Sequence, residues 1–163
     1  MTRQDPGGVG ALPRNGELIR SSACEMVERL SRGDVNPHEL LDVVEARIEE
    51  TDGQLNALPT LCFDRAREGA ERLRKRAPAD TASGYLHGLP IVVKDHSDVA
   101  GVRTTYGSMA FVDHVPARSD YMVERLEANG ALIVAKSNTP EFGAGSQTFN
   151  DVFGTTKIGR AHV

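Results

Sequence analysis

The sequence contains no tryptophan and has only 3 tyrosines and 5 phenylalanines among its 163 residues. So few aromatic rings leave little surface on which single-stranded nucleic acid could stack. Basic charge is not in excess either, because 19 Lys and Arg face 23 Asp and Glu, which gives a net charge of −4. An acidic balance provides no electrostatic attraction for nucleic acid or for an anionic membrane. We therefore expect no direct nucleic-acid partner and no membrane partner.

Cysteine and long apolar runs are scarce as well. The two cysteines, Cys24 and Cys62, are too few for a disulfide-dense secreted scaffold or a four-cysteine zinc site. No apolar run approaches the roughly 20 residues that span a bilayer. Residues 1–16 are polar and rich in Gly and Pro, without the apolar stretch of a secretory signal. We expect a cytoplasmic protein with free thiols whose residues 1–16 form a disordered tail.

Two helices are expected to form an N-terminal hairpin. Apolar residues of the segment 18–30 recur at helical spacing, and Gly33 is a typical helix stop. Asn36 is a good helix cap and Pro37 suits the first helical position, so a second helix begins there and ends before Asp52. Each helix has one apolar stripe, so the hairpin must cover another layer of the protein.

The remainder of the chain alternates between strands and helices. We expect an edge strand within 57–63, a charged helix from Asp64, a strand buried on both faces at 89–93, a helix from Ser119 (its cap) to Asn129, and a second buried strand at 131–135. This order, with glycines between the elements, is typical of an α/β protein with parallel strands.

Lysines follow both apolar runs directly, Lys94 after the first and Lys136 after the second. Reactive groups of α/β sheets gather outside the carboxyl ends of strands, so both are candidates. Spacing alone favours solvated lysines or salt-bridge partners. Asp95, His96 and Asp98 suggest a metal site, but neighbours in a strand point to opposite faces. We therefore expect no metal.

Other motifs are weak. The stretch Gly143-Ala144-Gly145-Ser146 lacks the third glycine and the Lys-Ser/Thr pair of a phosphate loop. Ser146 also lacks the G-x-S-x-G frame of a nucleophile elbow. Cys62 has no nearby histidine and is interpreted as a small hydrophobic residue. These residues leave the reaction open.

Several ordered blocks resemble one known family. They read GLPIVVKD (88–95), RTTYGSMAF (103–111) and YMVERLEANGALIVAKSNTPEFGAGSQTFNDVFGTT (121–156), preceded by SRGDVNPHELLDVVEARIEETDGQLNA. With them the chain resembles the amidase signature family, serine hydrolases that cleave carboxamide C–N bonds. The resemblance implies an α/β fold: the N-terminal part of the amidase signature fold, with a mixed β-sheet flanked by helices and preceded by the helical hairpin. It places this partial amidase domain at 17–157 and implies a small-molecule amide substrate and neither metal nor organic cofactor.

Family resemblance also suggests roles for single residues. Its members use a lysine, a serine held by a cis peptide bond and a nucleophilic serine, and Lys94 corresponds to the lysine, the terminal base. A base must be neutral, and burial against the apolar run 89–93 is expected to favour that form. Gly143 falls where the acyl pocket is bordered, and Asn138 and Glu141 match positions that fix loops by hydrogen bonds. Lys136 has no catalytic counterpart and is interpreted as structural.

The Gly/Ser-rich segment that carries both serines of the family is expected shortly beyond Thr156. The chain instead continues as KIGRAHV. Residues 158–163 match the translation of a common sequencing adapter, so we expect this end to be non-native. We also expect the chain alone to be inactive, since it lacks the nucleophile and the oxyanion donors. The resemblance leaves room for a homo-oligomer of the full-length protein.

Three other functions fit the sequence. One is an amidotransferase subunit that supplies ammonia to misacylated tRNA, which uses the same triad. Another is a non-catalytic interaction module made of a helical hairpin on a short sheet. The third is a metal-dependent hydrolase that uses His96 and Asp98, and it would require the metal that we do not expect.

Overall fold

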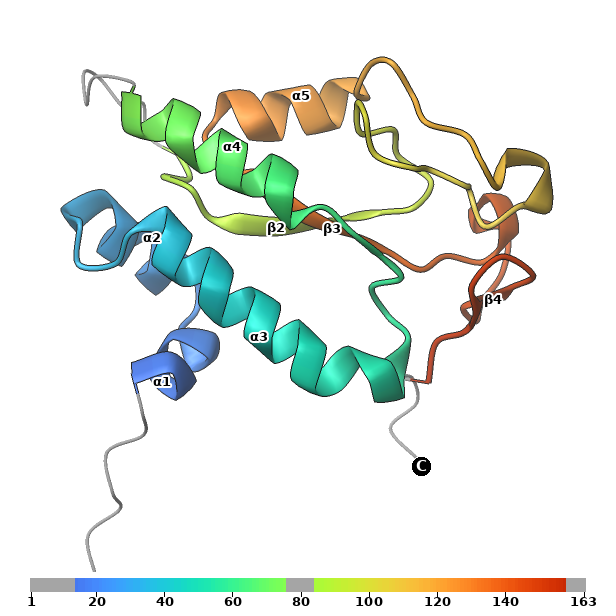
Figure 1. Cartoon of the computed structure of the whole chain (residues 1–163), viewed down its shortest axis with the longest axis horizontal. Helices are drawn as coiled ribbons and strands as arrows, with labels where there is room; N and C mark the ends of the chain where they lie inside the picture. The colour runs from blue at the N-terminus through green and yellow to red at the C-terminus, as the bar shows by residue number, and fades with distance from the viewer. Residues whose placement is uncertain (1–13, 76–83, 158–163) are drawn as a thin grey trace, which may run out of the picture.

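The structure is a computed structural model that describes residues 14–75 and 84–157, with side chains from residue 16 onward (Figure 1). The segment 1–13 of the predicted tail and the predicted non-native end at 158–163 lie outside these residues. Within the described ranges, no helix combines the length and the apolarity needed to cross a membrane.

Helices and short strands alternate along the chain. The helices are α1 (Arg14–Arg20), α2 (Ala23–Arg32), α3 (Pro37–Leu55), α4 (Phe63–Lys75) and α5 (Tyr121–Ala128), and the strands are β1 (Thr60–Leu61), β2 (Pro90–Lys94), β3 (Leu132–Ser137), β4 (Phe149–Asn150) and β5 (Gly154–Thr155). Two 3-10 turns, η1 (Met109–Phe111) and η2 (Glu141–Gly143), lie in the loops.

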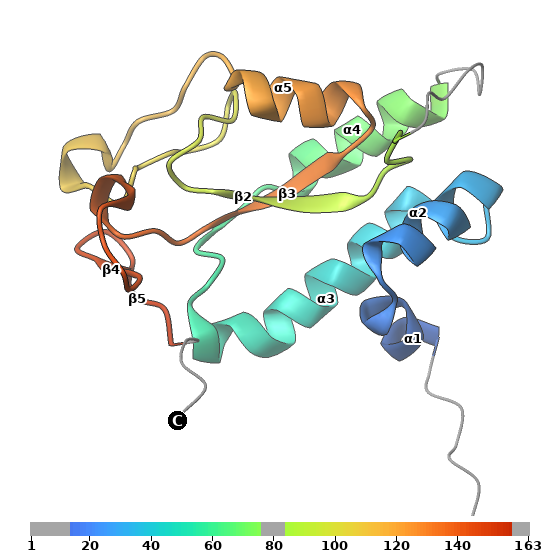
Figure 2. The ribbon, with the colours of Figure 1, turned by 180° about the vertical axis from the view of Figure 1, so that it is seen from behind.

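Strand β3 is the centre of a three-stranded sheet with the order β1-β3-β2. It runs antiparallel to β1 and parallel to β2, so the predicted mixed sheet and the predicted edge strand are both confirmed. Figures 1 and 2 show the sheet between α3 and α5. The chain is thus an α/β structure with helices on both faces of its sheet.

The two faces of the sheet bury separate apolar clusters. On one face, Leu132 and Val134 of β3 pack with Leu41 of α3 and with Ala66 and Ala70 of α4. On the other face, Val93 and Ile133 pack with Val123 of α5 and with Val99 and Val102. The helical hairpin therefore covers a second layer, as its amphipathic stripes predict.

The strand β2 differs from the prediction. It was expected to be buried on both faces, but Val92 is 41% exposed, and Val93 is the buried residue of the strand. The reason is its place in the sheet, since β3 pairs with one edge and no described strand pairs with the other. Only β3, which has neighbours on both sides, shows the continuous burial that an apolar run predicts.

A β-bulge shifts the register between the two parallel strands. Ile91 pairs with Ile133, but Val92 pairs with Ala135, so β3 contributes one extra residue. Side chains normally alternate between faces, and a bulge changes which residues share a face. Lys136, paired with Val93, is thereby brought to the same face as Ile133.

The N-terminal hairpin contains a break that was not predicted. The segment 18–30 forms two helices rather than one, and α1 begins at Arg14, inside the predicted tail. Ser22 separates them because its side chain accepts a hydrogen bond from the amide of Glu25, whose carboxylate accepts from the Ser22 amide. This reciprocal capping box starts a new helix at Ala23. The predicted stop at Gly33 is confirmed by its left-handed conformation.

Helix α3 starts as predicted and ends later. The Asn36 side chain accepts from the Glu39 amide, and Pro37 is the first helical residue. The helix passes through Asp52 to Leu55, and the Asp52 carboxylate instead accepts from the amide of Ala57 just beyond the helix end.

The start of α5 is also corrected. Ser119 does not cap it, because the Ser119 hydroxyl accepts from the amide of Ala100, and Asp120 occupies the cap position.

The capping box at α2 gives a stability prediction. Replacing Ser22 by Ala removes the acceptor for the Glu25 amide and is expected to lower the free energy of unfolding by about 1 kcal/mol. Denaturant unfolding measures this change. The matched control is Ser31→Ala, because the Ser31 hydroxyl only donates to a carbonyl of its own helix. Equal effects of the two substitutions would contradict the capping assignment.

Candidate active site

Lys94 lies at the carboxyl end of β2, paired with Ser137 at the end of β3. The backbone continues this pairing, since the amide of Asp95 donates to the carbonyl of Ser137 at 2.9 Å. The Lys94 side chain is exposed, which contradicts the predicted burial against 89–93. Because β2 is an edge strand and Lys94 shares the face of the exposed Val92, the apolar run does not enclose the amine.

The buried lysine is Lys136. Its side chain and that of Asp95 are both 0% exposed, and Nζ of Lys136 lies 3.1 Å from Oδ1 of Asp95. Nζ also donates to the Thr104 hydroxyl at 2.6 Å. Burial lowers the pKa of Lys136, and the nearby Asp95 carboxylate acts in the opposite direction. The structural role predicted for Lys136 is thus a buried ion pair rather than a solvated strand end.

Asp95 also holds the turn that follows Thr104. Its Oδ2 accepts from the Thr105 amide at 3.0 Å and from the Thr105 hydroxyl at 2.6 Å. Its carbonyl accepts from the Tyr106 amide at 3.0 Å. One aspartate therefore fixes the end of β2 and two consecutive residues of the turn 104–107.

This turn packs directly against the loop after β3. The Phe142 amide donates to the Tyr106 carbonyl at 2.7 Å, and both residues have positive φ angles, 52° and 54°. Such a conformation is unfavourable for side chains larger than glycine, and it persists where the surroundings enforce it. The two strained residues therefore mark a contact that the fold holds tightly.

The loop after β3 is held by the predicted asparagine. The Asn138 amide group donates to the Gly154 carbonyl and to the Thr156 hydroxyl, and its oxygen accepts from the Asn150 side chain at 2.7 Å. These bonds confirm that Asn138 fixes loops. Glu141, expected to do the same, is exposed and lies on the wall of a pocket instead.

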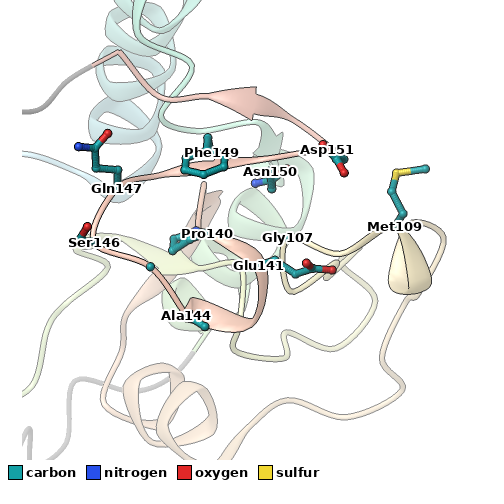
Figure 3. A pocket seen from close by; sticks show the side chains of 11 residues that line it. Gly107, Met109, Pro140, Glu141, Ala144, Ser146, Gln147, Phe149, Asn150 and Asp151 are labelled. Carbon is teal, nitrogen blue, oxygen red and sulfur yellow. The ribbon is translucent and has the colours of Figure 1, made fainter.

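This pocket, of about 480 Å³, lies between the turn 104–107, η1, the loop after β3 and β4 (Figure 3). Its apolar lining comes from Met109, Pro140, Ala144 and Phe149, and its polar lining includes Glu141, Ser146, Gln147 and Asp151. Gly143, predicted to border an acyl pocket, lies between the lining residues Glu141 and Ala144. Its own neighbour is the His96 ring, which would lie 3.4 Å from a Cβ at this position. The volume of the pocket lies within the range of small-molecule sites, and most of its lining residues are exposed in the described part of the chain.

The three residues weighed as metal ligands have separate partners. Asp95 pairs with Lys136, His96 contacts the Ser97 hydroxyl at 3.2 Å, and Asp98 accepts from the Tyr106 hydroxyl at 2.6 Å. Burial and this bond to Asp98 raise the pKa of Tyr106 to about 12. Among the residues that the structure describes, no three such side chains converge in a way that could hold a metal ion.

Neither of the weaker nucleophile candidates gains support. Ser146 is exposed on the pocket wall. Cys62 packs beside the Val93 cluster and its thiol donates to the Ile133 carbonyl at 3.3 Å. Burial raises the pKa of this thiol to about 11, so it stays protonated near neutral pH, as expected of a small hydrophobic residue.

Comparison with known proteins decides the family. The family model named Amidase matches residues 39–160, which include β2, the turn 104–107 and the loop after β3. The chain belongs to the amidase signature family. Its mixed sheet flanked by helices is the fold shared with solved members of that family.

Three relatives show the extent of this similarity. The chain is 38% identical over 137 residues to a glutamyl-tRNA(Gln) amidotransferase subunit of Anaeromyxobacter dehalogenans, a match that covers 84% of the chain and 28% of that protein. It is 30% identical over 135 residues to the acylamidase of Rhodococcus erythropolis, with 83% and 28% covered. A solved bacterial aryl acylamidase of the amidase signature family matches with a TM-score of 0.75 at 28% identity, over 83% of this chain and 29% of that one. The chain thus spans about 28% of the length of the curated amidase relatives.

Sequence reasoning missed the buried pair of Lys136 and Asp95 and its contacts to Thr104 and Thr105. One signal was present, since the apolar run 131–135 places Lys136 at the end of the most buried described strand. A lysine that continues such a run needs a counter-charge if it is buried. The partner could not be named, because the bulge sets which face Lys136 shares.

Gly107 gives a test of the contact between turn and loop. Its φ is +68°, and a Cβ there would lie 2.9 Å from the Thr139 carbonyl oxygen. Gly107→Ala is expected to lower the free energy of unfolding by about 1–3 kcal/mol, measured by denaturant titration. Gly53→Ala is the matched control, because its Cβ meets nothing within 4 Å. The control should be neutral or stabilising, and a Gly107→Ala variant as stable as the parent would contradict the packing described.

Proposed function

We propose that the full-length protein that contains this chain is a serine amidohydrolase, in which Lys94 is the terminal base. The position of Lys94 carries the proposal, because it is the last residue of a strand in an amidase-family sheet. The loop after β3 begins beside it, at the same end of the sheet, and lines a pocket. Chemical groups at the carboxyl ends of parallel strands are well placed to meet a ligand. The two serines of the triad would come from the part of the protein outside this chain. The chain itself spans about 28% of the length of its curated relative.

The reaction would proceed by acyl transfer. The nucleophilic serine attacks the amide carbon while its proton passes through the bridging serine to the neutral Lys94 amine. The C–N bond then breaks, the proton leaves with the amine, and water hydrolyses the acyl ester by the same relay. Oxyanion donors, which stabilise the charge on the former carbonyl oxygen, belong to the same Gly/Ser-rich segment.

Lys94 must lose contact with bulk water to work as a neutral base. In the described residues its side chain is exposed, beside the unpaired edge of β2 and the exposed Val92. An apolar strand edge of this kind calls for a covering element. We propose that the rest of the protein covers this edge and supplies the desolvation that favours a neutral amine.

The pocket is proposed to receive the acyl part of a small-molecule amide. Met109, Pro140 and Phe149 offer apolar surface, and the polar lining residues can orient the amide group. Gly143 belongs to the same loop and would shape the pocket through its backbone, because a Cβ added there would meet the His96 ring at 3.4 Å.

An amidotransferase role is the second candidate. Its support is the 38% identity to the glutamyl-tRNA(Gln) amidotransferase subunit. In that case the full-length protein would hydrolyse glutamine and pass ammonia to a partner subunit. Release of glutamate from glutamine by the full-length protein, stimulated by co-purifying subunits, favours this role. Release of 4-nitroaniline from 4-nitroacetanilide without partners favours the amidase.

We place either protein in the cytoplasm, on the grounds of its unpaired cysteines, Cys24 and Cys62.

Lys94→Ala tests the base assignment in the full-length protein. Without an acceptor for the relayed proton, kcat for 4-nitroacetanilide or glutamine is expected to fall at least about 1,000-fold, as is usual for triad members. The control is Lys75→Ala at the exposed end of α4, which should leave kcat unchanged. Retention of most activity by Lys94→Ala would refute the assignment.

The isolated chain of 163 residues gives a separate prediction. We expect it to hydrolyse neither probe above the buffer rate, because nucleophile and oxyanion donors are proposed to lie elsewhere in the protein. The assay follows ammonia and 4-nitroaniline release at the concentration at which the full-length protein is active. Turnover by the isolated chain that disappears in its own Lys94→Ala variant would overturn this division of the machinery.

A further inference from the structure

The ion pair between Lys136 and Asp95 has no role in the proposed proton relay. One of its members, Asp95, directly follows Lys94 in the sequence. We propose that this pair is a positioning device, which holds the end of β2, and with it Lys94, in a fixed place relative to the turn 104–107 and the pocket. The inference rests on the proposed function, because it explains how the base is aligned with the substrate site.

The Lys136 amine joins two elements to the central strand. From β3 it reaches Oδ1 of Asp95 at the end of β2, 3.1 Å away, and donates to the Thr104 hydroxyl at 2.6 Å. The Lys136 ammonium group thus contacts both the strand end and the turn, in addition to the direct hydrogen bonds that Asp95 accepts from Thr105 and Tyr106. The contact with Asp95 is an ion pair, and the bond to Thr104 is a charge-assisted hydrogen bond, a class that is stronger and shorter than neutral hydrogen bonds.

Asp95 transmits this constraint to Lys94 through the backbone. Neighbouring residues of a strand point to opposite faces, so the buried Asp95 and the exposed Lys94 lie back to back. The amide of Asp95 is bonded to Ser137, its carbonyl to Tyr106 and its carboxylate to Thr105 and Lys136. A residue held at its amide, its carbonyl and its carboxylate leaves the adjoining peptide little freedom to rotate.

The same turn forms a wall of the pocket. Gly107, which lines the pocket, donates its amide to the Thr105 hydroxyl at 3.1 Å. Tyr106 accepts from Phe142 in the loop after β3. The backbone next to the base and the wall of the pocket are therefore connected through the contacts that Asp95 and Lys136 make to the turn 104–107.

The energetics favour a geometric purpose over a stabilising one. Burial of two charges is costly, and apolar residues of similar volume often serve a core equally well or better. The surroundings here are apolar enough for that, since Val93, Ile133 and Val102 form a buried cluster on the same face. Apolar side chains could fill this space, but they could not fix the turn at hydrogen-bond distance.

The test uses the full-length protein and compares stability with turnover. Lys136→Met replaces the aliphatic part of the side chain, which ends one atom short of the amine, and removes the ion pair with Asp95 and the hydrogen bond to Thr104. The Asp95 carboxylate then has no counter-charge. We expect a lower unfolding temperature and a kcat about 10- to 100-fold lower per folded molecule, with a smaller change in KM. The double variant Asp95→Asn/Lys136→Met removes the unpaired charge and keeps an acceptor for Thr105. Its unfolding temperature should return towards that of the parent, while kcat stays low. Recovery of kcat together with the unfolding temperature would overturn the proposal, because the pair would then be merely structural.

Two further variants keep the test decisive. Thr104→Val removes one acceptor of Lys136 with little change of shape. We expect a kcat several-fold lower in a well-folded protein, and a kcat equal to that of the parent would contradict the positioning role.

Arg65→Met is the matched control, because it breaks the ion pair of Arg65 with Glu127 between α4 and α5. It should lower stability without lowering kcat per folded molecule, and an equal loss of kcat would show that activity follows stability in general. Lys94→Ala separates the two hypotheses: if it stays active, the base assignment fails, whereas the comparison of kcat with stability still decides whether the pair positions the site.

Discussion

The burial of β3 is the constraint on which the rest of the structure depends. From Leu132 to Lys136 every residue of this strand is buried, with β1 on one side and β2 on the other. Helices α3 and α4 cover one face and α5 the other, through the clusters around Leu132 and Ile133. A strand surrounded in this way cannot leave a charge unpaired, so a lysine at its end forces a partner to be present. Asp95 is that partner, and the turn 104–107 is built around it.

Local chemistry predicted some helix ends correctly, because the signals for those ends lie within a few residues. The cap at Asn36 and the left-handed stop at Gly33 need no knowledge of the rest of the fold. The break at Ser22 was just as local, and its reciprocal bonds with Glu25 could have been recognised from the spacing of the two residues. The extension of α3 to Leu55 was less accessible, since Asp52 bonds to amides outside the helix only because the chain turns there.

The site could be predicted only in its family outline. The strand-end position of Lys94 followed from the apolar run before it, and the loop-fixing role of Asn138 followed from the resemblance. The structure places both residues on adjoining strand ends and loops. The burial of each lysine did not follow. Burial depends on how many strands flank a position and on which face it lies, and both are properties of the assembled sheet. A pattern of apolar residues along one strand contains neither.

The two lysines show this most clearly, because their sequence contexts are nearly the same. Each ends an apolar run, yet Lys136 is fully buried and Lys94 is exposed. Lys94 is exposed because β2 lies at the edge of the described sheet. Lys136 is buried because the bulge opposite Val92 turns it to the face of Val93 and Ile133. The arrangement separates two demands that a single lysine could not meet. A structural ammonium must keep its charge and its fixed partners, whereas a base must give up a proton and face the substrate. With Asp95 paired with Lys136 on one face of the sheet, the exposed Lys94 on the opposite face is free for the role of base that we propose.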